Sequence, residues 1–238
     1  MTNQSISQRL HDQLGQLIAN TKPGDRLLSE PELARRLGVS RATLREAMRT
    51  FETQGLIRRR QGSGTYVNHP SRVIETGLEV LESIETMAQR IGLPVTMGAL
   101  HIEQRPAKPE ESQALGLTVD QQVTSVSRVT LAEGHQAAYL IDILPEDILT
   151  PNELENGFTG SVLDFLLHRG SPALISSRSE IGAVTASVEV ARALAIQRGD
   201  VLLRFVAELY AANGRVVDYS YSYFLPGYFR FHVVRRVG

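Results

Sequence analysis

The feature that most constrains the fold is a pair of helical patterns separated by only three residues. Residues 29 to 32 read Ser-Glu-Pro-Glu, which matches a capping box and predicts that a helix begins there. Residues 38 to 40 read Gly-Val-Ser, where the glycine can adopt a positive φ and the serine can cap the next helix. A helix, a short glycine-containing turn and another helix form the helix-turn-helix pattern. The buried stripe of the helix before the turn is Leu33, Ala34 and Leu37.

Two more helices and a hairpin complete this part of the chain. Apolar residues recur at helical spacing between residues 6 and 18, and the helix after the turn is expected from about residue 41 to 54. After Gly55, two short β-prone runs flank the glycine-containing segment of residues 61 to 64, which predicts a β-hairpin. Three helices followed by a basic hairpin predict a winged helix-turn-helix over residues 1 to 70.

The charge is distributed unevenly along the chain. Residues 1 to 70 contain 11 Lys and Arg against 6 Asp and Glu, whereas residues 71 to 238 contain 14 against 20. A first segment with net charge +5, next to a remainder with −6, favours a polyanionic partner for the first segment alone. The pattern therefore favours double-stranded DNA as the partner of the winged helix.

The helix after the turn and the hairpin supply the candidate DNA contacts. We expect Arg41 and Arg45 to reach base edges or nearby phosphates, because Arg can bind guanine with two hydrogen bonds. The candidates for phosphate contacts are Ser40, Thr43 and Arg49, and those for the minor groove are Gln61, Gly62, Ser63 and Gly64. The alternative is a solvated face on which the arginines pair with Glu46 and Glu52.

One long run of this segment resembles a known family. PGDRLLSEPELARRLGVSRATLREAMRTFETQGLIRRRQGSGTYV resembles the DNA-binding domain of the GntR family of bacterial transcription regulators over about residues 5 to 68. In that family the DNA contacts fall at the start of the third helix and at the wing tip. The resemblance thus implies contacts from Ser40, Arg41, Thr43, Arg45, Gln61 and Gly62.

The rest of the chain has a different character. Residues 71 to 92 carry a helical apolar stripe and are expected to form a linker helix or the opening helix of the next domain. From residue 93 to 238, β-prone runs alternate with short helical patterns at residues 109 to 116, 161 to 169 and 187 to 195. A weak repeat at an offset of about 80 residues predicts two β-hairpins in one sheet of an α+β domain.

This second part resembles the UTRA ligand-sensing domain of the HutC subfamily of GntR regulators. The similarity rests on A-L-G-L-x-x-x-x-x-V with a following R-x-x-L-A-x-G, and on G-R-V-V-D-Y-S-Y-S-Y-F. It implies a chorismate-lyase-like α+β fold with a mainly antiparallel sheet and an effector cleft. The position that is often glutamate in sugar-phosphate sensors is Leu140 here, which argues against a polyhydroxylated ligand. The pocket candidates implied by position are Arg128, Ser161, Arg178, Glu180, Asp218 and Tyr223.

The charges of these candidates suggest the kind of effector. Arg128 and Arg178 can each form paired hydrogen bonds with a carboxylate or phosphate, so we expect a small anionic metabolite. The alternative for Arg178 with Glu180 is an exposed ion pair, and that for Tyr223 is simple packing on the strand.

The sequence carries no sign of catalysis. Cysteine is absent, the six histidines lack metal-ligand spacing, and no nucleophile elbow, phosphate-binding loop or zinc-protease motif occurs. Apolar runs are too short to cross a bilayer. We therefore expect a cytoplasmic homodimeric transcription regulator, most often a repressor in this subfamily, without cofactor or metal and not an enzyme. The alternatives are a DNA-tethered enzyme with a chorismate-lyase-like domain and a ligand-free DNA-bending dimer.

Overall fold

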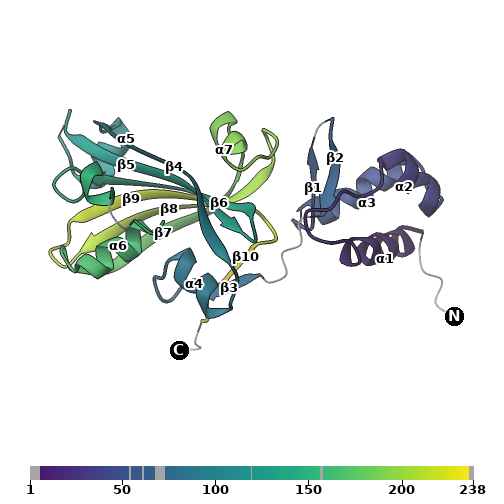
Figure 1. Ribbon diagram of the computed structural model, residues 1–238, viewed down its shortest axis with the longest axis horizontal. Coiled ribbons are helices and arrows are strands. Elements are labelled where there is room, and N and C mark those ends of the chain that lie inside the picture. Colours follow the sequence, from purple (N-terminus) through teal and green to yellow (C-terminus); the bar gives the residue numbers. More distant parts are fainter. Residues whose placement is uncertain are drawn as a thin grey trace.

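The computed structural model describes residues 6–53, 55–60, 62–67, 73–118, 120–155 and 158–235. Figure 1 shows two units, a small amino-terminal one made of helices and a hairpin, and a larger one built on a single wide sheet. The α+β fold class expected from the sequence is confirmed. None of the helices formed by the described residues is both long and apolar enough to cross a membrane.

The small unit contains the expected elements. Its core is formed by one apolar face from each helix, including the fully buried Leu14, Leu33, Leu44 and Met48. Gly38 ends the second helix with φ 66°, in the left-handed region that glycine adopts without strain. The elements are α1 (Ile6–Ala19), α2 (Glu30–Leu37), α3 (Arg41–Thr53), β1 (Ile57–Arg60) and β2 (Gly64–Val67).

The large unit is organised around one six-stranded antiparallel sheet. The strand order is β4-β5-β6-β9-β8-β7, so the hairpins β5-β6 and β8-β9 meet at the centre. This confirms the two hairpins in one sheet that the repeat predicted. The strands are β4 (Val95–Pro106), β5 (Gln122–Ala132), β6 (His135–Pro145), β7 (Leu174–Thr185), β8 (Val201–Ala211) and β9 (Val216–Phe224).

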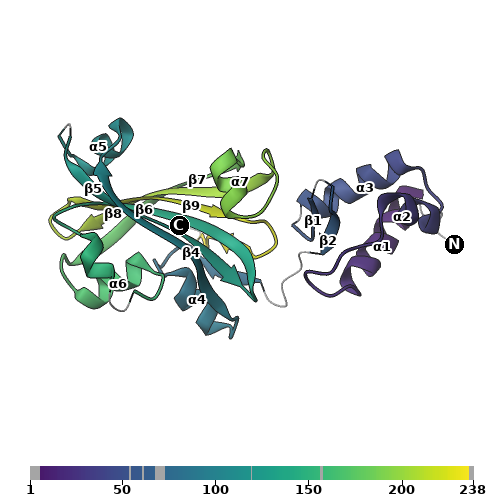
Figure 2. The ribbon, with the colours of Figure 1, turned by 45° about the horizontal axis from the view of Figure 1, so that its top comes forward.

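Short helices cover both faces of the sheet. In Figures 1 and 2, α5 (Pro109–Leu115) and α7 (Val188–Ala193) lie on one side, and α4 (Ile84–Arg90) and α6 (Val162–Arg169) lie on the other. A 3₁₀ turn, η1 (Pro151–Leu154), precedes α6. Helices α5, α6 and α7 fall where the sequence predicted them.

The prediction of a helix over residues 71 to 92 is wrong for the first half of that segment. Ile74–Gly77 forms strand β3, which pairs in parallel with β10 (Phe229–His232) near the end of the chain. Helix α4 begins only at Ile84, because the Ser83 hydroxyl accepts a hydrogen bond from the Thr86 N–H at 3.0 Å and caps it. Pairing with a strand more than 150 residues away overrides the helical spacing, and the β3–α4 segment belongs to the large unit.

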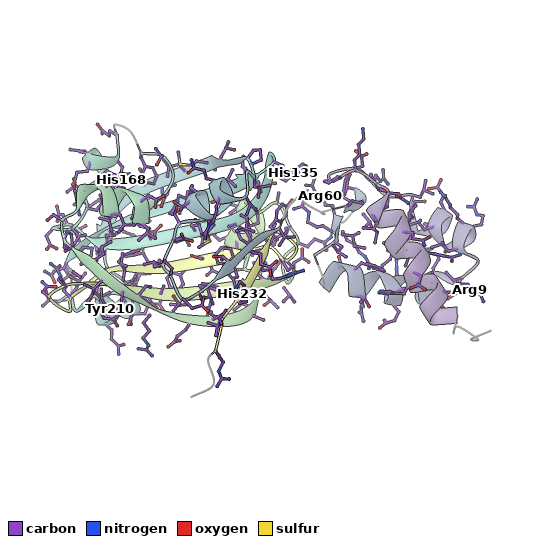
Figure 3. The ribbon with its side chains drawn as sticks, turned by 90° about the horizontal axis from the view of Figure 1, so that it is seen from below. Arg9, Arg60, His135, His168, Tyr210 and His232 are labelled. Atoms are coloured by element: carbon purple, nitrogen blue, oxygen red, sulfur yellow. The ribbon has the colours of Figure 1, made fainter. Side chains whose placement is uncertain are left out.

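The two units contact each other directly. The Arg58 guanidinium donates to the Leu194 carbonyl at 3.5 Å, and the Gln197 amide donates to the Arg59 carbonyl at 3.0 Å. Gly55, with φ 71°, lies so close to the Pro226 backbone that a Cβ there would be 2.1 Å from it. In Figure 3, His135 lies at the end of the large unit that faces the small one. The hairpin side of the small unit therefore docks on the large unit.

Candidate functional site

The first candidate surface lies at the start of α3, where two hydroxyls cap the helix. The Ser40 hydroxyl accepts from the Thr43 N–H at 3.1 Å and lies 2.8 Å from the Thr43 hydroxyl. Both side chains are exposed. A helix amino terminus that presents N–H and O–H donors to solvent is suited to a phosphate oxygen.

Three arginines extend this surface along α3. Arg41 is exposed and has no side-chain partner among the described residues. Arg45 is 56% exposed and donates from Nε to the Glu30 carboxylate at 2.7 Å, whereas Arg49 lies 3.6 Å from the exposed Glu46. Part of the expected solvated pairing therefore exists, and Glu30, which the sequence did not single out, is the partner of Arg45.

The hairpin contributes a turn with little side-chain bulk. Gly62 and Gly64 have φ of 74° and 123°, so the tight turn depends on glycine. The Ser63 hydroxyl lies 2.7 Å from the Tyr66 hydroxyl, which holds it against the hairpin. Gln61 was also expected at this tip, but it lies outside the described residues.

The three consecutive arginines of β1 have different surroundings. Arg60 is exposed, stacks over the Tyr66 ring at 5.1 Å, and is labelled in Figure 3 beside the gap between the units. Arg59 lies 3.4 Å from the Glu52 carboxylate. Arg58 is turned toward the large unit, where burial lowers the pKa of its guanidinium. Arg60 is thus the β1 arginine most exposed to a polyanion.

The second candidate site is a cavity of about 510 Å³ on one face of the large sheet. Side chains from β5, β6, β7, β8 and β9 form its floor, and the β3–α4 segment, the start of α6 and Phe231 of β10 close it. The floor is set by the two-residue alternation of strands. Paired residues such as Leu140, Ser222 and Phe205 fall on the same face of neighbouring strands.

The alternation separates the six expected pocket residues into two groups. Arg128, Ser161 and Asp218 line the cavity. Arg178 and Glu180 are on the opposite face of β7, since their neighbours Ser177, Ser179 and Ile181 line the cavity instead. These two are exposed and lie 3.3 Å apart, so their placement in the pocket was wrong and the alternative of an exposed ion pair is correct.

Tyr223 was also wrongly placed in the pocket. It follows the cavity-lining Ser222 on β9, so its ring projects from the other face, where it stacks on Tyr139 at 6.3 Å between ring centres. Burial raises the pKa of Tyr223, and the positive charge of the nearby Arg204 opposes this rise. Asp218 and Tyr223 are five positions apart, an odd spacing that by itself places them on opposite faces of a regular strand.

The cavity centres on a buried charge cluster. Arg128 is 5% exposed and its Nη1 donates to the Asp142 carboxylate, while its Nε has no hydrogen-bond partner in the described part of the chain. Asp218 accepts from the Ile143 N–H at 3.1 Å. Burial and the neighbouring Asp142 raise the pKa of Asp218 well above its usual range. The buried guanidinium is therefore bonded to Asp142 and lies near enough to Asp218 to act on its charge.

Asp142 and Glu85 are cavity residues that the sequence reasoning missed. Asp142 lies two positions after Leu140, so it is on the same face and supplies the acid that was thought to be absent there. The sequence did indicate Asp142, because it is a single carboxylate inside the otherwise apolar strand sequence AAYLIDILP. Glu85 is in the first turn of α4, and burial raises its pKa.

The start of α6 connects to this cluster through hydroxyls. Ser161 is 1% exposed and caps α6 by accepting from the Asp164 N–H at 3.0 Å. The Asp164 carboxylate in turn accepts from the Ser83 hydroxyl at 2.6 Å. Groups of three or more side chains suited to a metal ion do not occur among the described residues.

Comparisons with known proteins agree with this architecture. Residues 4–67 match the model of the bacterial regulatory proteins of the gntR family, and residues 90–230 match that of the UTRA domain. The HTH-type transcriptional repressor NagR of Bacillus subtilis is 27% identical over 91% of this chain and 89% of its own length. The mannosyl-D-glycerate transport/metabolism system repressor MngR of Escherichia coli is 28% identical over 96% of this chain and 93% of its own length.

A solved structure has the same fold. The crystal structure of PhnF from Mycobacterium smegmatis superimposes with a TM-score of 0.65 and 20% identity, covering 96% of this chain and 100% of the other. The similarity spans both units, as do the matches in sequence. The chain therefore belongs to the gntR family of bacterial regulatory proteins, with a UTRA domain as its larger unit.

Proposed function

We propose that this protein is a transcription regulator that binds operator DNA with its small unit and a small molecule with its large one. The observation that carries the proposal is the start of α3 in a helix-turn-helix, where Ser40, Thr43 and Arg41 are all exposed. The relatives, which match over nearly the whole chain, are named as repressors of transcription. This supports repression and gives the alternative of a DNA-tethered enzyme no support.

The proposed DNA contacts follow from exposure and geometry. Arg41 and Arg45 reach base edges in the major groove, and Ser40, Thr43 and Arg49 bind phosphates beside them. Gly62, Ser63 and Gly64 approach the backbone or minor groove from the hairpin, because the turn carries no long side chain at the described positions. The protein acts in the cytoplasm, where bacterial DNA lies.

The protein binds DNA as a homodimer, so that two small units contact two halves of a symmetric operator. An edge of the large sheet supports this. Strand β7 is an edge strand of twelve residues, and its outer backbone groups have no strand partner among the described residues. Sedimentation analysis should give twice the mass of the chain, and a monomer at micromolar concentration would contradict this part of the proposal.

The effector changes DNA affinity by binding differently to DNA-competent and DNA-incompetent arrangements of the two units. The β3–α4 segment both closes the cavity and follows the small unit in the chain, so it is the connection through which the two sites communicate. Effector binding therefore changes the affinity for DNA, and DNA binding changes the affinity for the effector by the same factor.

The test of the proposal is a titration of the DNA upstream of the protein's own gene. Wild-type protein should bind it with a Kd at least about 10³-fold below that for unrelated DNA. Arg41→Ala should weaken specific binding about 5- to 150-fold, the value of one base contact, without changing the fold. Arg178→Ala, on the exposed face of β7, is the matched control and should bind DNA like wild type. Equal affinity of wild type for both DNAs would refute the proposal.

A further inference from the structure

The charges that line the UTRA cavity are mainly negative. Among its described lining residues, Arg128 is the single cation, and neither lysine nor histidine is present. Five carboxylates line the same cavity, from Glu79, Glu82, Glu85, Asp142 and Asp218. Glu82 is paired with Arg90 and Glu79 accepts from the Val234 N–H, so the negative charge deep in the cavity comes from the other three. This opposes the anionic effector that we expected from Arg128 and Arg178, because Arg178 is not in the cavity.

The arginine that remains is already neutralised. Its Nη1 donates to the Asp142 carboxylate, a charged hydrogen bond inside the protein. A ligand carboxylate or phosphate would have to displace Asp142 and leave it buried beside Asp218 without a counter-ion. Leaving one charge of a buried pair without its partner is strongly unfavourable. Anion binding at Arg128 is therefore disfavoured by its surroundings.

The helix end that faces the cavity has also been compensated. The Ser83 hydroxyl caps α4 and donates to the Asp164 carboxylate at 2.6 Å, and Glu85 lies in the first turn of the helix. Carboxylates at this position offset the positive end of the helix dipole. The half-buried Glu85 lines the cavity and has no hydrogen-bonded cation among the described residues.

One buried donor in the cavity has no acceptor among the described residues, and one buried acid there is bonded to no cation among them. Asp218, 6% exposed, accepts from the Ile143 N–H and hydrogen-bonds to the Asp142 side chain, and no cation is hydrogen-bonded to it among the described residues. The Nε of Arg128 is a buried donor for which the described residues supply no acceptor. Buried polar groups of this kind are normally satisfied by a hydrogen-bonding partner. An oxygen acceptor beside Arg128 would satisfy its Nε, and a cation beside Asp218 would stabilise the ionised form of that carboxyl group.

We propose that the effector is a small organic cation, an ammonium or guanidinium compound that also carries a hydroxyl or carbonyl oxygen. The cationic nitrogen binds between Asp218 and Glu85, and the oxygen accepts from Arg128 Nε. Serines of the cavity supply further hydrogen bonds, and its phenylalanines pack against the ligand's carbon skeleton; these include Ser161, Ser177, Ser179, Ser220 and Ser222, with Phe205, Phe224 and Phe231. This inference rests on the proposed function, in which the cavity is the effector site.

The carboxylates give the binding a pH dependence. Burial and the neighbouring Asp142 raise the pKa of Asp218. Burial also raises the pKa of Glu85; the nearby Arg128 opposes this rise, whereas Asp164 and Asp142 add to it. A bound cation stabilises both ionised carboxylates, so binding releases protons and tightens as pH rises. An anion would show the opposite trend.

The experiment compares probes that differ in the charge of a single group. One set is tyramine, tyrosol and 4-hydroxyphenylacetate, and another is 4-aminobutanol, 1,4-butanediol and 4-hydroxybutanoate. Full-length protein is titrated with each, with calorimetry and thermal unfolding as readouts. We expect at least one amine to bind about tenfold or more tightly than its matched acid, the value of one charge-assisted hydrogen bond. Tighter binding of an acid, or no binding by either amine at millimolar concentration, would overturn the inference.

Two variants test the residues. Asp142→Asn/Asp218→Asn should weaken the amine about tenfold or more and allow the matched acid to bind, since Arg128 is then free. Glu85→Gln, which keeps the size of the side chain and removes its charge, is used in the same way if the double variant does not fold. Glu180→Gln is the control, because its carboxylate lies on the outer face of the sheet. Amine binding that is unchanged in both Glu85→Gln and a folded double variant would also overturn the inference.

The test of the cationic effector can be told apart from the test of the proposed function. DNA binding is measured on the same preparation without any probe. Specific DNA binding together with a preference for acids would refute only the cationic effector. Loss of specific DNA binding would refute the proposed function, whereas the preference of the cavity for amines would stand.

Discussion

Removing the carboxylate of Glu30 should tighten DNA binding. Glu30 is only 19% exposed and accepts from Arg45 Nε at 2.7 Å, and its other oxygen lies 3.9 Å from Arg59 Nη1. In the free protein it therefore holds an arginine that we assign to DNA. The variant Glu30→Gln keeps the size of the side chain and removes its charge.

The expected gain can be worked from two contributions. Arg45 is 56% exposed, so its pair with Glu30 contributes about 0.5 kcal/mol, the level typical of an exposed pair, and this is lost when Arg45 turns to DNA. A carboxylate about 10 Å from a phosphate adds a repulsion of about 0.4 kcal/mol in water. Together they give about 1 kcal/mol, or about fivefold tighter binding.

The assay is fluorescence anisotropy with labelled upstream DNA at low and moderate salt. The gain should shrink as salt rises, because both contributions are screened. Thermal stability should fall slightly, since Glu30 lies in the first turn of α2 and favours that helix end. Glu180→Gln, a carboxylate removed from the large unit, should leave DNA affinity unchanged. Weaker binding by Glu30→Gln would refute the reasoning and mean that Glu30 holds Arg45 in the geometry that DNA requires.

Three further changes test the stability of the two units and their contact. Gly55→Ala places a methyl group 2.1 Å from the Pro226 backbone at a φ of 71°, so the units should separate, which small-angle scattering would detect as a larger radius of gyration. Leu14→Ala removes a fully buried side chain and should cost the small unit about 2 to 5 kcal/mol, seen in calorimetry as an earlier first transition with the second unchanged. Burial alone would raise the pKa of Glu111, but hydrogen bonds from Arg105 at 2.7 and 2.8 Å help to lower it below its usual value. Its stabilising effect is therefore present above the ordinary glutamate pKa and lost as pH falls through the lowered one, and Glu111→Gln should flatten the acid side of a curve of Tm against pH.

Local patterns were enough to predict the small unit. The caps at Ser29 and Ser40, the left-handed glycine at Gly38 and the glycines of the hairpin all act within a few residues of the chain. Because each of these signals works over one turn, the elements they predict do not depend on the rest of the molecule. The identity of the partner of Arg45 was beyond such patterns, since Glu30 is fifteen residues away on another helix.

The first half of the segment before α4 shows the limit of periodicity. The spacing of Ile74, Leu78 and Leu81 fits a helix, but Leu78 and Leu81 are 37% and 47% exposed. The backbone of Ile74–Gly77 is instead paired with β10, whose residues lie at the far end of the chain. An apolar spacing over so few residues is compatible with either element, and only the available neighbour decided between them.

The sequence alone determined that the chain has a helix-turn-helix with a basic outer face and an α+β domain with two equivalent hairpins. It also supplied Arg128, Ser161 and Asp218 as residues of one cavity. Only the tertiary structure decided the sign of the charge that lines this cavity, since Arg178 faces outward and Asp142 and Glu85 face the cavity. The physical reason is that strand register and the closing helix fix which face each side chain occupies, and a shift by a single residue moves a charge to the other side of the sheet.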